Sequence, residues 1–234
     1  MKTMPRWQTL DIARGWAVIA MISFHLIWDL AHFGYIAENI AWAQPFKAFG
    51  HTIASSFLFI AGISLTLAHD PKIHWRAYLR HLALISASAA LVSIGTYVAF
   101  PSAYVFFGIL HCIATASVIA LGLVIFPWPL ALSAALFFLL LPFFFSSPMF
   151  NADLWQWLGL STREPMTQDW RPLFPWAAPL FFGVAAAKSF IKPKTNKSGT
   201  SGPIAFLGRH SLMVYLLHQP LIFTVLSNLG PTTR

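Results

Sequence analysis

Residues 10–30, LDIARGWAVIAMISFHLIWDL, decide the fold class of this protein. The stretch is apolar over about the 20 residues that an α-helix needs to cross a bilayer. It nevertheless contains four ionisable side chains, Asp11, Arg14, His25 and Asp29. A charged side chain at membrane depth costs about 3 kcal/mol or more. The sequence therefore predicts a membrane helix whose polar face is turned towards protein instead of lipid.

The composition of the whole chain excludes a water-soluble globule. Of its 234 residues, 57% are hydrophobic and 9% are charged, whereas a soluble domain has about 45–50% and about 25%. The net charge of +8 does not indicate nucleic-acid binding, because the cations lie beside apolar runs and not in a solvent-facing patch. One cysteine, Cys112, excludes an internal disulfide or a cysteine-rich metal centre.

Seven apolar runs predict an all-α, polytopic membrane bundle of about seven transmembrane helices. Open strands would leave backbone groups unsatisfied in lipid. The first run is about 19 residues long and lacks a small-residue cleavage site, so we expect a retained span and not a signal peptide. No segment between runs is long enough for a soluble domain, and residues 1–234 are expected to form one membrane-embedded domain. The runs cover residues 12–30, 49–68, 81–100, 103–126, 129–145, 173–191 and 204–227.

The distribution of Lys and Arg predicts the orientation of the bundle. Cytoplasmic connections of membrane proteins carry an excess of these residues, which here puts the N-terminus in the cytoplasm and the C-terminus outside. The polar stretch KPKTNKSGTSGP at residues 192–203 is expected to be a flexible cytoplasmic connector. We expect the protein in a bacterial cytoplasmic membrane, with membrane lipid as its surroundings; a homodimer is left open.

The four polar groups of the first run share one helical face. The 18 residues from Asp11 to Asp29 make five turns at 3.6 residues per turn. His25 and Asp29 are one turn apart, so the carboxylate can hold an imidazole N–H and fix its tautomer, as in a general-base pair. Arg14 lies roughly 16 Å below His25, near the cytoplasmic face. The alternatives are an interhelical clamp for the pair and an interfacial anchor for Arg14.

The last run adds a second polar face. In residues 207–220, LGRHSLMVYLLHQP, Ser211, Tyr215 and His218 share a face and are candidates for a substrate pocket. Arg209 and His210, at its cytoplasmic start, are candidates for contact with a phosphate, or else interfacial anchors.

Further candidates lie in other runs and loops. His51 opens the second run and is a second candidate for a catalytic base, and His111 in the fourth is a candidate for the pocket; either can instead be a packing group. Arg76 and Arg80 are one turn apart and suit either lipid headgroups or the phosphates of a nucleotide. Tryptophans and carboxylates in residues 146–172 suit an aromatic belt or a sugar at the outer mouth.

Several stretches resemble known membrane acyltransferases. In LDIARGWAVIAMISFH, at residues 10–25, an L-D-x-x-R motif is followed eleven residues after the Arg by a histidine. Residues 57–65, 172–184 and 207–220 resemble the bacterial DUF1624 proteins, which belong with the heparan-alpha-glucosaminide N-acetyltransferase catalytic domain within the wider transmembrane acyltransferase superfamily. The resemblance extends from the first run to the last.

The resemblance implies transfer of an acyl group from cytoplasmic acetyl-CoA, or another acyl-CoA, to a hydroxyl or amine acceptor across the membrane, with a sugar or glycan as one acceptor class. It also implies that His25 is the motif histidine and that Arg14 lies near CoA. The family's catalytic histidine lies in the loop after the first core span, where this chain offers His32 and His51. The choice between His25 and His51 stays open.

Two other classes of function use the same residues. A proton-coupled carrier or a non-catalytic membrane protein can contain buried charges as a relay. A haem b cytochrome needs two histidines on facing helices, and His25, His51, His111 and His218 are candidates. We expect an acyltransferase that uses neither metal nor haem.

Overall fold

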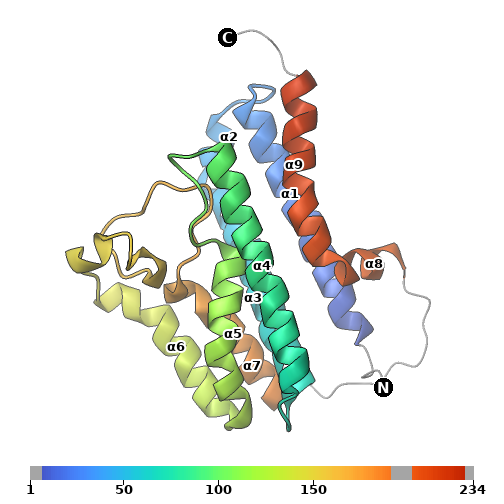
Figure 1. The fold of residues 1–234 in the computed structure, drawn as a ribbon, viewed down its shortest axis with the longest axis vertical. Coiled ribbons are helices and arrows are strands. Elements are labelled where there is room, and N and C mark those ends of the chain that lie inside the picture. Colours follow the sequence, from blue (N-terminus) through green and yellow to red (C-terminus); the bar gives the residue numbers. More distant parts are fainter. Residues whose placement is uncertain (1–6, 191–201, 230–234) are drawn as a thin grey trace. The chain divides into compact units, whose positions relative to one another are not determined.

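The computed structural model describes residues 7–190 and 202–229, and in these ranges the chain is helical, without a strand. Two 3₁₀ turns, η1 (Pro148–Asn151) and η2 (Gln156–Leu158), follow α6 (Figure 1). The prediction of an all-α protein is confirmed. The proposed connector at 192–203 lies almost wholly outside the described residues. The helices are α1 (Gln8–His32), α2 (Asn39–Trp42), α3 (Gln44–His69), α4 (Trp75–Ala99), α5 (Ile109–Ile125), α6 (Trp128–Phe144), α7 (Leu173–Ser189), α8 (Pro203–Arg209) and α9 (Ser211–Leu229).

Four of the described helices, α1, α3, α4 and α9, are long and apolar enough to cross a membrane. Helices α5 and α6 are apolar but have 17 residues each, about 25 Å of helix against a hydrocarbon thickness of about 30 Å. Every predicted run contains a helix, but only four of the described helices qualify as spans by length and composition, so the prediction of seven spans is not confirmed.

Two predicted boundaries are wrong. The fourth run was expected to be helical from residue 103, but α5 begins at Ile109. Residues 103–108 instead pair with a later loop, where the Ala103 carbonyl accepts from the Gln168 amide at 2.9 Å and the Phe107 carbonyl accepts from Arg171 N at 3.0 Å. The last run was expected to be one helix but is divided at His210, whose φ and ψ of −105° and 19° end α8 before α9 begins.

Close contacts divide the chain into two units, which we describe separately. The first unit, residues 1–57 and 193–234, contains α1, α2, the beginning of α3, α8 and α9. Helix α1 packs along α9, and α8 crosses the beginning of α1 (Figure 1). Apolar side chains fill this interface: Val18, Met21 and Ile53 are buried, with Phe24, Phe57, Val214 and Tyr215 against them.

Glycines allow α8 to approach α1 at backbone distance. A Cβ atom on Gly208 would lie 1.7 Å from the Asp11 carbonyl oxygen, and one on Gly15 would lie 2.1 Å from the Ile204 carbonyl oxygen. Since neither position has room for a side chain, α8 and α1 are in direct backbone contact near Asp11 and Gly15. This contact holds the end of α8, where Arg209 lies, beside the beginning of α1.

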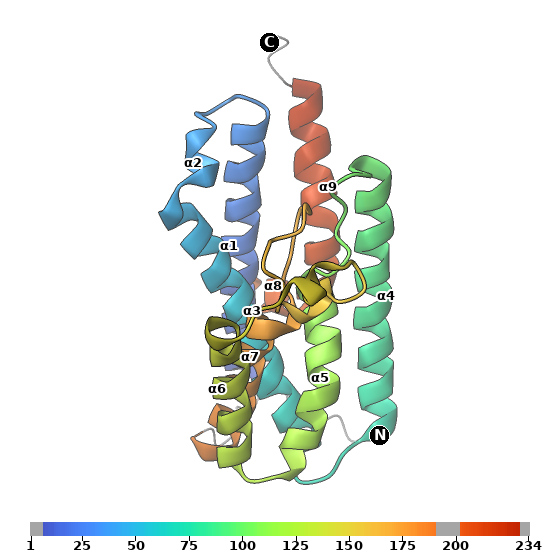
Figure 2. The same cartoon turned by 90° about the vertical axis from the view of Figure 1, so that its left-hand side faces the viewer.

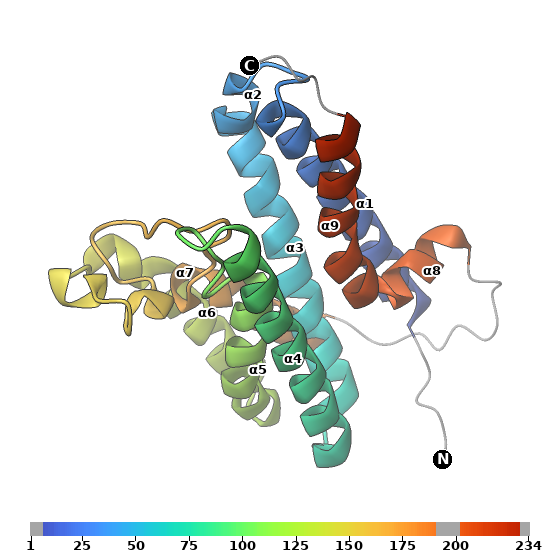
Figure 3. The same cartoon turned by 45° about the horizontal axis from the view of Figure 1, so that its top comes forward.

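The second unit, residues 58–192, contains the rest of α3 and helices α4 to α7. Helix α7 packs against both α6 and α5, and α5 also packs against α4 (Figures 2 and 3). Gly62 of α3 and Gly183 of α7 permit another close approach, since a Cβ on Gly62 would lie 1.9 Å from the Leu180 carbonyl oxygen. Lys188 donates to the Val124 carbonyl and lies 3.8 Å from Asp70, so this charge inside an apolar run has partners.

Candidate functional site

Among the described residues of the first unit, Asp29 is the most deeply buried charged residue. Its exposed fraction is 0%, and both carboxylate oxygens accept hydrogen bonds from Gln219 Nε2, at 3.0 and 3.2 Å. Asp29 lies in α1 and Gln219 in α9, so this contact joins the polar faces of the two helices. A buried carboxylate needs such donors, because an unpaired buried charge is strongly unfavourable.

One turn below, His25 of α1 faces His218 of α9. Their ring centroids are 4.9 Å apart and the ring planes make an angle of 60°. His218 is 7% exposed, and the Tyr215 ring lies 5.9 Å from it. The structure therefore brings together His25, Asp29, Tyr215 and His218, which the sequence placed on two separate helical faces. Asp29 accepts from Gln219, and its orientation of His25 stays a prediction.

The two nitrogens of His218 have different surroundings. Nδ1 lies 2.8 Å from the Tyr215 carbonyl oxygen and 3.2 Å from that of Val214, both within α9. Nε2 is buried and has no hydrogen-bond partner among the described residues, and the same is true of Gln219 Oε1. His218 and Gln219, which are consecutive in α9, thus each have one buried side-chain atom without a hydrogen-bond partner.

At the other end of α1, Arg14 and Asp11 form an ion pair. Arg14 donates to Asp11 at 3.0 Å, and the side chains are 27% and 6% exposed. The Arg14 side chain therefore keeps part of its surface accessible. Arg209, at the end of α8, lies over the Phe206 ring at 5.9 Å, and His210 Nδ1 is 2.9 Å from the Phe206 carbonyl oxygen. Because α8 is locked to α1 near Asp11, Arg14 and Arg209 belong to the same end of the first unit.

The remaining candidates of the first unit are less enclosed. His51 is an exposed residue of α3, and Ser211 is half-buried at the first position of α9. Phe24 of α1 stacks on Phe46 of α3 with centroids 4.4 Å apart, which aligns the beginning of α3 with α1.

In the second unit, His111 serves the local structure. Its Nδ1 accepts from the Gly108 amide at 3.3 Å, and its Nε2 lies 3.2 Å from Ser93 Oγ, which donates to the Val105 carbonyl. Both ring nitrogens are therefore engaged in holding the loop before α5. The place of His111 in a substrate pocket stays a prediction.

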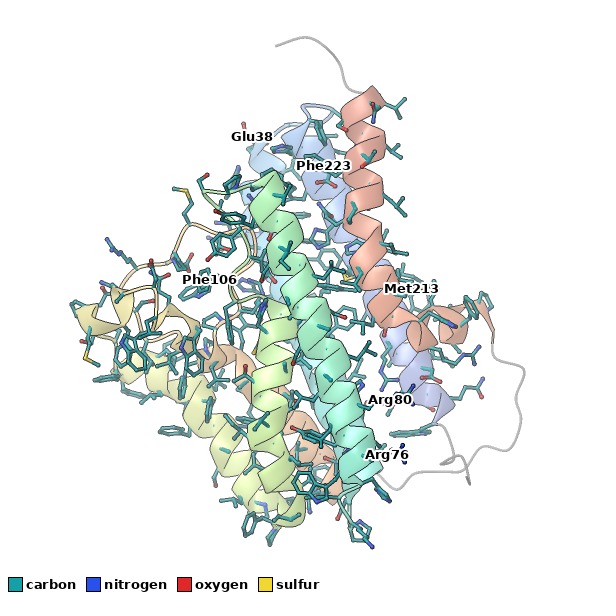
Figure 4. The ribbon with its side chains drawn as sticks, viewed as in Figure 1. Glu38, Arg76, Arg80, Phe106, Met213 and Phe223 are labelled. Carbon is teal, nitrogen blue, oxygen red and sulfur yellow. The ribbon has the colours of Figure 1, made fainter. Side chains whose placement is uncertain are left out.

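Arg76 and Arg80 lie in the first turns of α4, near the same end of that helix, and both are exposed (Figure 4). Because they are four residues apart on one helix, the two side chains are neighbours on its surface. Such a pair suits phosphate or lipid headgroups. Across the described residues, no group of three or more His, Cys, Asp or Glu side chains gathers as a metal site would.

Comparison with known families shows to which family the chain belongs. The family model of the heparan-alpha-glucosaminide N-acetyltransferase catalytic domain matches residues 6–220. The chain belongs to this family. Searches among curated proteins and among solved structures gave no significant match. For a member of the heparan-alpha-glucosaminide N-acetyltransferase family, the apolar helices indicate an integral membrane protein and the family indicates an acetyltransferase. The matched range includes His25, Asp29, His218 and Gln219, and it ends within α9.

Sequence reasoning missed Gln219 in this family member. The residue directly follows His218 in the sequence HQP, but the i, i+4, i+7 pattern assigned only Ser211, Tyr215 and His218 to the polar face. A wider face for the last run would have included it, since a buried Asp29 requires a donor from a neighbouring helix.

Proposed function

We propose that this protein is a membrane-bound acyltransferase that moves an acetyl or other acyl group from cytoplasmic acyl-CoA to a hydroxyl or amine acceptor, such as a sugar, across or at the membrane. The family match over residues 6–220 carries this proposal. The paired polar faces of α1 and α9 support it, because membrane helices keep buried ionisable groups mainly where these have a function.

Attack on a thioester requires removal of a proton from the acceptor, and a positioned histidine contributes typically 10²- to 10⁴-fold to such a step. His25 is the first candidate for the base, with Asp29 as the group that orients it, and His51 is the alternative. His25 is supported by its place beside His218 and one turn from buried Asp29.

The cationic end of the first unit suits the donor. CoA carries phosphates, and guanidinium groups bind phosphate oxygens in a bidentate manner. Arg14 keeps accessible surface, and α8 brings Arg209 and His210 to the same end. In this proposal these residues bind the CoA phosphates. Arg76 and Arg80, in the second unit, are a separate candidate pair for phosphate or for lipid headgroups. Along the continuous helix α1, Arg14 is roughly 16 Å from His25, so an extended CoA arm can reach the histidines.

The proposal includes the predicted topology. Seven spans with a cytoplasmic N-terminus, in a bacterial cytoplasmic membrane, would present the donor end of α1 to cytoplasmic acyl-CoA. The histidines and the loop at residues 146–172 would then lie towards the outer side, where a sugar acceptor is available. Helices α5, α6 and α7, of 17 residues each, would cross as short spans beside the four longer ones, at the lower limit of about 17 residues.

Binding of acetyl-CoA tests the donor side. Isothermal titration of the purified, folded protein with acetyl-CoA should show binding, and the Arg14→Gln variant should bind about tenfold to a hundredfold more weakly, because a hydrogen bond to a charged group contributes about 1.5–3 kcal/mol. Arg163→Gln, which removes an exposed arginine of the outer loop, is the matched control. Absence of binding by folded wild-type protein to acetyl-CoA and longer acyl-CoAs would contradict the proposal.

A further inference from the structure

Two buried hydrogen-bond acceptors lie side by side in the sequence of α9. His218 Nε2 and Gln219 Oε1 each have no partner among the described residues. Both side chains face α1, since one ring packs on His25 and the other side chain bonds to Asp29. Those two contacts are four residues apart on α1, about 6 Å along the helix.

The chemistry of Nδ1 makes His218 Nε2 an acceptor. The two atoms near Nδ1 are backbone carbonyl oxygens, which only accept hydrogen bonds. Nδ1 must therefore contain the proton, and in a neutral imidazole the other nitrogen then keeps its lone pair. The backbone of α9 fixes this tautomer without any help from another side chain.

The chemistry of Asp29 makes Gln219 Oε1 the second acceptor. A carboxylate accepts hydrogen bonds, so the amide of Gln219 must direct its nitrogen at Asp29, as the structure has it. The amide oxygen is then turned away from Asp29. Asp29 thereby holds the orientation of Gln219.

Such atoms are uncommon in folded proteins. About 90% or more of buried polar groups have a partner, and leaving one unsatisfied costs about 1–3 kcal/mol. His111 in this chain shows the ordinary situation, because both its ring nitrogens are engaged. Among the described residues, Tyr78 Oη and Ser161 Oγ are also buried without a partner, but only His218 and Gln219 are consecutive and face an ionisable helix face. Two such acceptors side by side are suited to donors from a ligand or from water that a ligand displaces.

We propose that His218 Nε2 and Gln219 Oε1 bind the acceptor of the acyl transfer, a substrate with two adjacent hydrogen-bond donors such as a primary amine or a pair of neighbouring hydroxyls, and that His218 takes the acceptor's proton. The assignment rests on the proposed function. In this refinement His218, and not His25, is the base. Gln219, held by Asp29, orients the substrate. The His25 ring packs against the His218 ring.

The resulting step is balanced. The N–H or O–H bond of the acceptor breaks, its electron pair forms the bond to the thioester carbonyl carbon, and the proton moves to His218 Nε2. The carbon–sulfur bond then breaks, and the CoA thiolate leaves and receives this proton. The products are the acylated acceptor and free CoA.

The tautomer can be measured without any substrate. Nitrogen NMR of the full-length protein with ¹⁵N-labelled histidine, in lipid nanodiscs, should show a neutral imidazole with a protonated Nδ1 and a bare Nε2. Its signal should be absent from His218→Gln and present in His74→Gln, a control that removes an exposed histidine. A bare Nδ1 at His218 would overturn the inference.

The role is tested by transfer of labelled acetyl from acetyl-CoA to two probes that differ in one group, glucosamine and glucose. His218→Gln should lower kcat by about 10²- to 10⁴-fold while the Kd of acetyl-CoA is unchanged. Gln219→Met should raise KM for the probe about tenfold or more. Asn228→Asp, an exposed amide on the same helix, should change neither. Faster acetylation of glucosamine would show that the acceptor group is an amine, and faster acetylation of glucose would show that it is a pair of hydroxyls.

The outcomes separate the two proposals. If wild-type protein acetylates a probe and His218→Gln keeps kcat within a factor of about two, the assignment of His218 is wrong and the transferase function stands. If wild-type protein neither binds acetyl-CoA nor transfers acetyl, the proposed function fails, and this assignment fails with it.

Discussion

Asp29 and Gln219 show what a single buried contact contributes in this protein. Asp29 has no exposed surface, and both its carboxylate oxygens accept hydrogen bonds from Gln219. Gln219→Leu leaves a buried carboxylate without those donors, so we expect a loss of about 1–3 kcal/mol or more in the free energy of unfolding. Thermal or steric-trap unfolding of the purified protein measures this loss.

The double variant supplies the control for that prediction. Adding Asp29→Leu to Gln219→Leu removes the orphaned charge, and the double-mutant cycle should give a coupling of about 0.5–3 kcal/mol, as for residues in direct contact. Additive losses would mean that Asp29 and Gln219 do not interact in the folded protein.

The histidine candidates make a second prediction at this scale. His25 packs against His218, whereas His51 is exposed on α3. His25→Gln should therefore reduce acetyl transfer by at least about tenfold, because the neighbouring ring that packs on His218 is lost, and His51→Gln should have the smaller effect. The activities of the two variants, measured at equal amounts of folded protein, decide between them. The reverse order would favour the loop histidine that the family resemblance implies.

Individual residues were predictable where they break a pattern. Asp29, His25 and His218 are polar in apolar runs, which the sequence alone reveals. Gln219 was not predicted, because an amide beside a proline carries no periodic signal until its partner helix is known. The sequence also could not show which lone histidine has a structural role. His111 and His218 are both single histidines in apolar runs, and only the hydrogen bonds of the folded protein distinguish them.

At the scale of helices, glycines decide which surfaces meet. Gly62 leaves no room for a Cβ beside the Leu180 carbonyl, whereas Gly122 on α5 has nothing within 4 Å. Gly62→Ala should therefore destabilise the second unit by more than about 1 kcal/mol through overpacking. Gly122→Ala should be neutral or stabilise by up to about 1 kcal/mol through helix propensity. Thermal unfolding of both variants tests the pair, and equal effects would contradict the close approach of α3 to α7.

The beginning of α5 depends on a residue far away in sequence. Asp169 Oδ2 accepts from the Ile109 amide at 3.0 Å, at the first turn of α5, and Asp169 also lies 3.4 Å from Arg171. Asp169→Ala should cost about 1 kcal/mol of stability, as for the loss of a helix cap, and Asp169→Asn should cost less. Asp153→Ala, at an exposed position of the same loop, is the control. A loss as large for Asp153→Ala would show that the contact at Asp169 is unimportant.

The helices could be predicted from the sequence where they depend on local properties, and not where they depend on contacts with distant residues. Apolar runs located every long helix, because lipid-compatible length is a local property. The start of α5 at Ile109 and the break at His210 were missed. The first depends on pairing with residues 167–171, and the second on the glycine contact between α8 and α1. Neither partner is adjacent in the sequence.

For the whole molecule, the number of spans fixes the side on which the C-terminus lies. With seven spans and a cytoplasmic N-terminus the C-terminus is outside, whereas four spans would leave both termini on one side. Alkaline phosphatase fused after residue 234 should therefore be active in a bacterial host, and the same enzyme fused after residue 72 should be inactive because that loop is expected to be cytoplasmic. An inactive C-terminal fusion, with protein present in the membrane, would contradict seven spans.

Acetyl transfer is the central claim, and proteoliposomes test it most directly. Labelled acetyl-CoA is supplied on the side of the N-terminus and a mixture of glucosamine and glucose on the other, and labelled product is then identified by mass spectrometry. The account predicts acetylated sugar on the far side with wild-type protein and at least about a hundredfold less with His218→Gln. Folded wild-type protein that binds acetyl-CoA yet forms no acetylated product would contradict it.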